Sequence, residues 1–570
     1  MMYRMEHPKP QWERNQWMNL NGLWQFEFDH GNSGEARKFY SSDASYSQQI
    51  NVPFCPESKL SGIEYKDFMS SIWYKRMFTL EKEQLKGNVF LHFGAVDYVA
   101  TIYINGQKCG SHKGGYVSFY LDITKYVVEG ENVVVVHAED DTRSPFIPSG
   151  KQSGLYESHG CMYTRTTGIW QTVWLEFVPK NYIKKAKYYP DVQAGTLTIH
   201  ADFVGTGNFL VQASFEGESM GEVSLENVSG FTVATLHLKE KHLWEIGKGG
   251  LYDLTLQYNE DVVHSYFGLR SIEYTNYKFL LNGKSVFQRL VLDQGFYPDG
   301  VYTAPSDAEL EADVDCSMAM GFNGARLHEK VFEERFLYHC DRKGYIVWGE
   351  YPNWGVDVSS PKAVYSLLPE WLEEIERDFN HPSIVGWCPF NETWDCDGRK
   401  QLDDVVSLVY YATKAADQTR PCIDTSGNFH VVTDIYDLHD YEQNPEEFAS
   451  HYENFSKDGS ISDYSFVLHR QPKYDGKMPF FISEYGGIRW TNDQSGWGYG
   501  EAPKTKEEFL ARLKGLTDVL LDNEKMFGFC YTQLTDVEQE QNGIYTYDRK
   551  PKFEVFEIYP IFAKKAVIED

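Results

Sequence analysis

The chain contains 570 residues, of which 42% are hydrophobic and 16% aromatic, and it carries a formal net charge of −29. At roughly 150 residues per domain, this length and composition predict about three or four globular domains, each with a core of its own. A surface this acidic repels phosphate backbones and anionic lipids, so we expect neither a nucleic acid nor a membrane as a partner.

Residues 1–180 are predicted to form an antiparallel β-sandwich. Short β-branched or alternating runs occur at Val89–Phe93, Ala100–Ile104 and Asn132–His137, and the turn dipeptide Asn105-Gly106 directly follows the second run. Runs of this kind with Asn-Gly between them are typical of hairpins. Residues 181–271 continue the β pattern with four runs whose spacing is typical of a seven-strand sandwich of about 100 residues. The four runs are Thr196–His200, Phe209–Ala213, Thr232–Leu236 and Tyr252–Leu256.

From residue 272 to 570 the pattern changes to strands that alternate with helices, which indicates parallel βα units. Eight strand candidates and helices such as Val364–Phe379 and Lys506–Leu521 predict a closed (β/α)8 TIM barrel. A dinucleotide-binding sheet is excluded, because the loop after the first strand lacks the glycine-rich phosphate turn. The eight candidates are Val286–Leu292, Phe322–Leu327, Tyr345–Glu350, Ile384–Phe390, Cys422–Thr425, Asp434–Leu438, Pro479–Ser483 and Phe527–Thr532.

The fourth strand candidate ends in Asn391 and Glu392, after a fully apolar run. Polar residues at the carboxyl ends of barrel strands line the active site, so Glu392 is the first candidate for chemistry. Trp387 and Trp394 flank it, and we expect them to exclude water and to raise the pKa of Glu392, as a general acid requires. The alternative is a surface glutamate at a strand-to-loop junction.

The seventh strand candidate ends in Glu484, which places a second carboxylate at the same edge of the barrel. Two carboxylates at one barrel mouth can act as acid and nucleophile, the minimum machinery for breaking a glycosidic bond. Glu484 alone could be a structural acid. The other open readings are a carbohydrate-binding protein without activity and a different hydrolase or lyase that uses the same two groups as acid and base.

Five motifs occur in this order along the chain: Leu20–Phe26 (LNGLWQF), Phe93–Asp97 (FGAVD), Gly114–Tyr116 (GGY), Tyr163–Gln171 (YTRTTGIWQ) and Gly321–Arg326 (GFNGAR). Together they resemble glycoside hydrolase family 2, which contains β-galactosidases, β-glucuronidases and β-mannosidases. The resemblance implies a jelly-roll sugar-binding domain, an immunoglobulin-like sandwich and a catalytic TIM barrel. It also implies that Glu392 is the acid/base and Glu484 the nucleophile of a retaining mechanism.

The resemblance implies three further roles at strand ends. Asn391 would bond the sugar 2-hydroxyl, Arg326 would lie beneath the nucleophile and favour its ionised form, and Tyr441 would bond the nucleophile. Each has a structural alternative: an amide that caps backbone groups, an ordinary ion pair and a packed aromatic. Glu350 resembles a position that binds magnesium in some relatives, but one carboxylate is poor evidence for a metal. We therefore expect no metal and no cofactor.

The choice of sugar depends on positions where the sequence departs from its relatives. Asp293 and Gln294 stand where many members carry Arg-His-Glu, and His328 follows Arg326, so these three are candidate sugar ligands. They could equally be turn or structural residues. Glu540 lies where glucuronidases carry an Asn-x-Lys pair, and it would repel a uronate. Glu540 could equally be a solvated loop acid, in which case the missing lysine alone disfavours a uronate. A neutral sugar is therefore expected, with a β-galactoside first, and a glucuronide, mannoside, glucoside or arabinoside as alternatives.

The nine cysteines contain no CxxC pair, which argues against a structural zinc site and a disulfide framework. The first residues lack an apolar signal core, and no run approaches the roughly 20 apolar residues of a membrane span. We therefore expect a cytoplasmic enzyme with reduced thiols, acting on a carbohydrate or glycoside. Family relatives often assemble, so a homo-oligomer is also an expectation.

Overall fold

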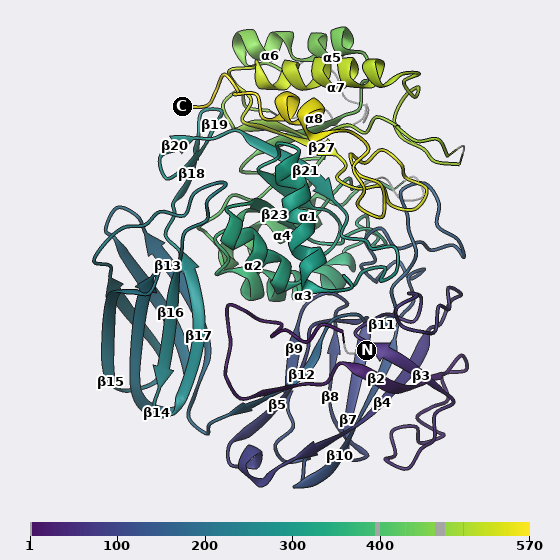
Figure 1. The fold of residues 1–570 in the computed structure, drawn as a ribbon, viewed down its shortest axis with the longest axis vertical. Helices are drawn as coiled ribbons and strands as arrows, with labels where there is room; N and C mark the ends of the chain where they lie inside the picture. Colours follow the sequence, from purple (N-terminus) through teal and green to yellow (C-terminus); the bar gives the residue numbers. More distant parts are fainter. Residues whose placement is uncertain (1–2, 394–398, 428, 462–473, 494) are drawn as a thin grey trace.

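The computed structural model describes residues 3–393, 399–427, 429–461, 474–493 and 495–570. Trp394 lies outside the described residues. Two β-rich parts, drawn in purple to teal, lie below and beside a mixed part that contains the helices α1 to α8 (Figure 1). The β-sandwiches and the barrel confirm the predicted fold class.

The first part is a sandwich of a four-stranded sheet, in the order β1-β12-β5-β9, and a six-stranded sheet, in the order β3-β2-β4-β10-β7-β8. In β10, Val134 and Val136 join the core between the sheets, while Val133 and Val135 join a smaller cluster with Trp73. This period of two explains why the all-valine run is buried on both faces. The strand bounds are β1 (Trp17–Asn19), β2 (Gly22–Phe28), β3 (Gln48–Val52), β4 (Ser71–Leu80), β5 (Asn88–Phe93), β6 (Val96–Asp97), β7 (Val99–Ile104), β8 (Gln107–Lys113), β9 (Phe119–Asp122), β10 (Gly130–Glu139), β11 (Gly168–Ile169) and β12 (Val173–Val178), with the 3-10 helix η1 (Lys82–Leu85).

The second part contains fewer and longer strands than predicted. The runs expected at Thr196–His200 and Phe209–Ala213 form one 20-residue strand, β14, whose first half pairs with β13 and whose second half pairs with β16. Register shifts between Phe203 and Phe209 mark β-bulges, which bend a strand and let it serve both sides of a sandwich. The strands are β13 (Tyr182–Asp191), β14 (Thr196–Phe215), β15 (Glu218–His237), β16 (Leu251–Tyr258) and β17 (Asp261–Gly268).

The third part is built on a seven-stranded parallel sheet in the order β24-β23-β22-β21-β27-β26-β25. The segment predicted as the fifth strand forms only isolated parallel bridges, from Trp387 to Cys422 and from Asn391 to Ser426. It therefore continues the barrel beside β24 without a regular ladder. The strands are β21 (Gln288–Asp293), β22 (Gly324–Leu327), β23 (Ile346–Glu350), β24 (Ile384–Cys388), β25 (Tyr436–Asp440), β26 (Phe480–Gly486) and β27 (Gly528–Thr532), after a small sheet of β18 (Ile272–Thr275), β19 (Lys278–Leu281) and β20 (Lys284–Ser285).

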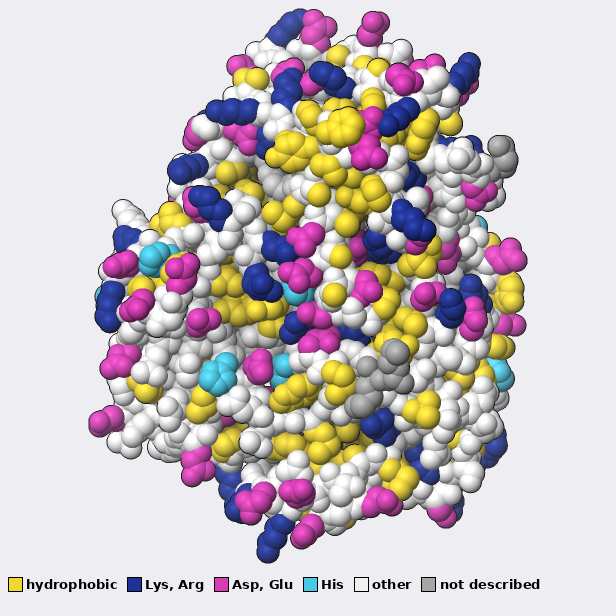
Figure 2. Space-filling view, in the orientation of Figure 1, with side chains coloured by type: hydrophobic (Ala, Val, Ile, Leu, Met, Phe, Trp, Pro, Cys, Tyr) yellow, Lys and Arg dark blue, Asp and Glu magenta, His cyan; other side chains and the backbone are white. Residues whose placement is uncertain are grey.

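Helices connect the barrel strands, and the amphipathic α3 buries Trp371 and Ile375 against the sheet. None of the helices in the described ranges combines the length and apolar character that a membrane crossing requires. Figure 2 shows acidic and basic side chains interspersed over one face, with hydrophobic side chains gathered around α8. The helices are α1 (Asp307–Ala319), α2 (Glu334–Lys343), α3 (Ala363–Asp378), α4 (Asp403–Ala416), α5 (Pro445–His451), α6 (Glu453–Asp458), α7 (Lys506–Leu521) and α8 (Val555–Phe562).

Candidate active site

Glu392 lies just beyond β24, in a backbone conformation that few non-glycine residues adopt. Its φ is +42°, and its backbone N–H donates to the carbonyl of Ser426 at 3.0 Å. Left-handed backbone costs of order 1 kcal/mol or more and persists where the surroundings impose it, often at functional sites. Here the neighbouring segment 422–426 fixes the turn that positions the Glu392 side chain.

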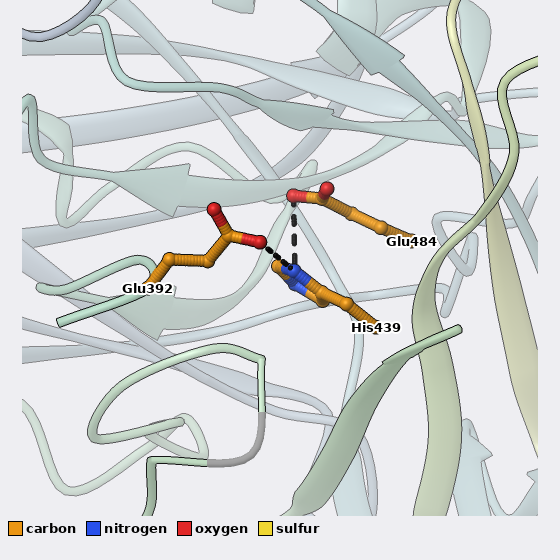
Figure 3. Close-up of side chains that lie close together, drawn as sticks. All are labelled: Glu392, His439 and Glu484. Carbon is orange, nitrogen blue, oxygen red and sulfur yellow. Dashed lines mark hydrogen bonds and ion pairs between the residues drawn. The ribbon is translucent and has the colours of Figure 1, made fainter. Parts of the chain in front are cut away.

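Glu392, His439 and Glu484 converge at the carboxyl ends of the barrel strands (Figure 3). Nδ1 of His439 lies 2.7 Å from Oε1 of Glu392, and Nε2 lies 3.4 Å from Oε1 of Glu484. One carboxylate oxygen from each glutamate lies within 4.8 Å of the other. Retaining glycosidases hold their two carboxyl groups about 5 to 5.5 Å apart, so this short separation fits a nucleophile and an acid/base.

Glu484 is held from two sides within β26. Nη1 of Arg326 donates to its Oε1 at 3.1 Å, and the hydroxyl of Tyr441 donates to its Oε2. Arg326 is fully buried and also donates to Oε1 of Glu350 at 2.5 Å and to Oδ1 of Asn391 at 3.1 Å. The structure thus brings together Arg326, Asn391 and Tyr441 with the catalytic candidates.

Asn391 keeps a free donor in this network. Its Oδ1 accepts from Arg326, while its buried Nδ2 has no hydrogen-bond partner among the described residues. An unpaired buried amide N–H is costly, and a substrate hydroxyl is a natural acceptor for it. This position suits the predicted contact with a sugar hydroxyl.

The expected rise in the pKa of Glu392 is wrong. Burial does raise the pKa, but the hydrogen bond and charge of His439 outweigh it, and the pKa lies below the ordinary value. Trp387 does not shield the carboxylate, because its indole N–H donates to Asp417 at 2.8 Å and its ring contacts Trp371. Glu392 therefore faces a cationic partner where an apolar wall was expected.

His439 is one of two site residues that sequence reasoning missed. It is the penultimate residue of β25, two positions before Tyr441, so the same strand-end rule that selected Tyr441 could have selected it. Burial lowers the pKa of His439, but Glu484 and Glu392 together raise it above its ordinary value. The imidazole consequently favours the charged form between the two carboxylates.

Three residues predicted to bind the sugar lie at strand ends, and two of them already have hydrogen-bond partners within the protein. Nδ1 of His328 lies 3.1 Å from Glu350, and burial holds its pKa well below the ordinary value. Asp293 accepts from the backbone N–H of Gly295 at 2.9 Å, which is the turn contact weighed as the alternative. Burial and the nearby Asp313 raise the pKa of Asp293 to about 6. Gln294 is buried, and its Oε1 has no partner among the described residues.

The first domain contributes residues to the barrel mouth. The hydroxyl of Tyr163 donates to Glu540 at 2.5 Å, and Asn542 donates to the same carboxylate at 3.1 Å. Lys151 is buried, and its ammonium lies 3.8 Å from the centre of the Trp354 ring. The negative charge of Glu540 and of both catalytic candidates acts on Lys151. Sequence reasoning missed Lys151, because no local pattern marks a lysine in a long loop of another domain.

The cluster of Glu392, His439 and Glu484 has the residue types of a divalent metal site. A cation there would compete with the hydrogen bond between His439 and Glu392, and it would face the positive charges of Arg326 and Lys151. We therefore treat the three side chains as proton-exchanging groups. Glu350 is also engaged, by Arg326 and His328.

Family models match both ends of this architecture. The model of the family 2 glycosyl hydrolase sugar-binding domain matches residues 17–176, and the model of the family 2 TIM barrel domain matches residues 272–565. The chain belongs to glycosyl hydrolase family 2. This finding confirms the resemblance inferred from the motifs, and it establishes that the chain is a glycoside hydrolase.

Relatives of this family 2 glycosidase include both β-glucuronidases and β-galactosidases. It is 24% identical to a β-glucuronidase of Streptococcus agalactiae, with 94% of each chain covered. It is 26% identical to a putative β-glucuronidase of Formosa agariphila, over 73% of this chain but only half of the relative's length. It is 24% identical to a β-galactosidase of Thermoanaerobacter pseudethanolicus, over 74% of this chain and 55% of that protein.

Solved structures share the fold of this family 2 glycosidase from end to end. The β-glucuronidase of Lactobacillus rhamnosus superposes with a TM-score of 0.80 at 21% identity, and the match covers 100% of both chains. The Ruminococcus gnavus β-glucuronidase bound to D-glucuronic acid superposes with a TM-score of 0.79 at 20% identity, covering 98% of this chain. At these identities the likeness establishes the fold alone.

Proposed function

We propose that this family 2 glycosidase is an exo-acting enzyme that hydrolyses β-glycosides with retention of configuration. The observation behind the proposal is the pair Glu392 and Glu484, with carboxylate oxygens within 4.8 Å of each other at the barrel mouth. That separation leaves no room for a water between the two carboxyl groups, as inversion would require, but it suits a covalent glycosyl-enzyme.

The reaction proceeds in two displacements. Glu484 attacks the anomeric carbon while Glu392 protonates the leaving oxygen, and Glu392 then takes a proton from the water that releases the sugar. Arg326 and Tyr441 orient the nucleophile through their hydrogen bonds. The free Nδ2 of Asn391 donates to a sugar hydroxyl, a contact that strengthens as positive charge develops on the ring.

The loop of the first domain supports exo action. Tyr163 reaches Glu540, and Lys151 packs on Trp354, so the first domain covers part of the barrel mouth. An open groove that a polysaccharide could cross would leave this side uncovered. The enzyme therefore removes terminal sugar residues.

For the sugar itself, a β-glucuronide is our first candidate. Lys151 forms no ion pair among the described residues, so its ammonium is available to a uronate carboxylate. Burial raises the pKa of Glu540, so its carboxyl group repels a uronate less strongly than expected from the sequence. The relatives and solved structures named above as β-glucuronidases favour the same choice.

A β-galactoside is the second candidate, and Glu540 favours it. The carboxylate of Glu540 can accept hydrogen bonds from the hydroxyl groups of a neutral sugar, and Tyr163 and Asn542 hold it in place. Relatives named as β-galactosidases support this alternative.

Hydrolysis of p-nitrophenyl sugars, of both anomers and with neutral and acidic glycones, tests the proposal and separates the two candidates. We expect β anomers alone to be cleaved, with the glucuronide favoured. The variant Lys151→Met is expected to lose about 10- to 100-fold in kcat/KM on the glucuronide, since a hydrogen bond to a charged group contributes about 1.5 to 3 kcal/mol. Galactoside turnover should change far less.

The matched control is Lys113→Met, which removes an exposed lysine of the same domain that lies over the ring of Tyr98. It should leave all rates unchanged. Cleavage of the galactoside alone would reject the glucuronide assignment and keep the retaining mechanism. Turnover of no β-glycoside by folded protein would reject the proposed function.

A further inference from the structure

His439 lies between the two catalytic carboxylates, yet the double displacement described above assigns it no task. We infer that His439 is a positioning residue that shares with Glu392 the single proton used in general acid–base catalysis. The inference rests on the proposed function, and it adds a second group that holds the proton transferred by Glu392. The decisive geometry is the 2.7 Å contact between Nδ1 of His439 and Oε1 of Glu392.

The hydrogen-bond acceptors around His439 favour a hydrogen on both ring nitrogens. Nδ1 faces a carboxylate, which only accepts. Nε2 lies 3.0 Å from the hydroxyl oxygen of Ser426, whose own hydrogen is donated to Asp437 at 2.5 Å, so this oxygen accepts from the ring. Nη1 of Arg326, which is a donor only, lies farther from Nε2, at 3.5 Å. Nε2 also lies 3.4 Å from Glu484. A ring with acceptors at both nitrogens is an imidazolium, and a carboxylate beside it is ionised.

Charged groups face this pair from every surrounding strand. Carboxylates outnumber the other charges close to the ring, which stabilises its positive charge. The pKa of His439 is raised and that of Glu392 is lowered, as an ion pair requires. The groups are Glu392 after β24, Glu484 on β26, Asp437 on β25 itself with its partner His430, Glu350 on β23, Arg326 on β22, and His328, Glu329 and Lys151 from the adjoining loops.

The proton balance of the two steps follows from this arrangement. In the first step Glu484 bonds to the anomeric carbon, the glycosidic C–O bond breaks, and the proton of the pair passes through Glu392 to the leaving oxygen. In the second step a water oxygen bonds to that carbon, the bond to Glu484 breaks, and one water proton returns to the pair. A strongly coupled pair of this kind titrates as a unit, with pKa values that belong to the pair.

Replacing His439 tests the inference through the pH profile. The proton of the pair is retained above the ordinary histidine pKa of about 6.5, whereas a lone glutamic acid loses its proton nearer 4.3. In His439→Gln and His439→Asn we therefore expect the basic limb of kcat/KM to move down by about one pH unit or more. The loss at neutral pH should be about 10- to 100-fold for phenyl glycosides, and small for dinitrophenyl glycosides, whose leaving group needs no proton.

The control is His451→Gln, which removes a histidine bonded to the carboxylate of Asp440 at 2.8 Å, outside the catalytic pair. Its pH profile should match the wild type. An unchanged basic limb in an active His439 variant, or an equal loss for both leaving groups at every pH, would overturn the inference, because a merely structural histidine behaves in that way.

A second experiment tests the inference without replacing His439. Nitrogen NMR of labelled histidine follows the titration of His439 in the wild type and in Glu392→Gln. We expect the apparent pKa of His439 to fall when the carboxylate becomes an amide, since an opposite charge within hydrogen-bond distance is lost. Identical titration in both proteins would refute a shared proton. This result does not depend on turnover, so it separates a failure of this inference from a failure of the proposed function.

Discussion

The two carboxylates of the proposed catalytic pair have different surroundings. Glu484 lies inside a strand, its side chain is 6% exposed, and it accepts from a buried arginine and from a tyrosine. Glu392 lies beyond the end of its strand, its side chain is 12% exposed, and its close partner is an imidazole. One carboxylate thus has permanent cationic support, and the other has a partner that can itself gain or lose a proton.

This difference matches the two chemical tasks. A nucleophile must stay ionised until it attacks, and the Arg326 guanidinium cannot be deprotonated in a protein. An acid/base catalyst must change its protonation state twice in each cycle, so a fixed cation would oppose it. The site therefore holds a static charge pair beside a titrating one, with oxygens of the two carboxylates within 4.8 Å of each other.

The largest expected effects come from replacing each carboxylate. Glu484→Gln should lower kcat by at least about 10⁴-fold on every aryl glycoside, because no covalent intermediate can form. Glu392→Gln should lose about 10²- to 10⁴-fold on phenyl glycosides but much less on dinitrophenyl glycosides. Initial rates with the two leaving groups measure both, with folding checked by circular dichroism. Equal leaving-group dependence in the two variants would contradict the assignment of Glu484 as nucleophile and Glu392 as acid/base.

The next effect concerns the static charge on the nucleophile side. Arg326→Met should lower the free energy of unfolding by about 3 to 5 kcal/mol, because it leaves Glu350 and Glu484 buried without their cation. Activity should fall as well, since Asn391 and Glu484 lose a common donor. Urea unfolding and kcat/KM measure the two quantities.

Arg14→Met is the matched control for this variant, because Arg14 is also buried and bonded to a carboxylate, Asp261, at 2.7 Å, far from the barrel mouth. It should destabilise the protein to a similar extent and leave kcat unchanged in the folded fraction. Similar losses of activity in both variants would mean that Arg326 acts through folding alone.

The sequence allowed the fold class to be predicted, and it selected the two carboxylates that the structure brings together, because both depend on local regularities. Alternation of strands and helices marks a barrel, and a carboxylate after an apolar strand marks its mouth. The predicted helix Lys506–Leu521 coincides with α7 because its periodic apolar residues and the capping Thr505 fix both position and start.

What the sequence could not provide depends on contacts between distant segments. The pKa of Glu392 was mispredicted because the tryptophans were adjacent in sequence, whereas His439 approaches from another strand. Lys151 enters from the first domain. The two runs in β14 appeared separate because bulges, which interrupt the apolar alternation, do not interrupt the strand.

The smallest effect tests whether the nucleophile needs a second donor besides Arg326. Tyr441→Phe removes the hydroxyl that bonds Oε2 of Glu484 but keeps the ring, which stacks on Tyr499 with centroids 3.5 Å apart. We expect kcat/KM to fall about 10- to 100-fold, since a hydrogen bond to a charged group contributes about 1.5 to 3 kcal/mol. Because Tyr441 contacts the nucleophile, phenyl and dinitrophenyl glycosides should lose activity equally. Tyr258→Phe, which removes a hydroxyl bonded to a backbone carbonyl in the second domain, is the control and should retain full activity. A selective loss on phenyl glycosides in Tyr441→Phe would instead mean that Tyr441 assists the acid/base, and would contradict the separation of the nucleophile side from the acid/base side.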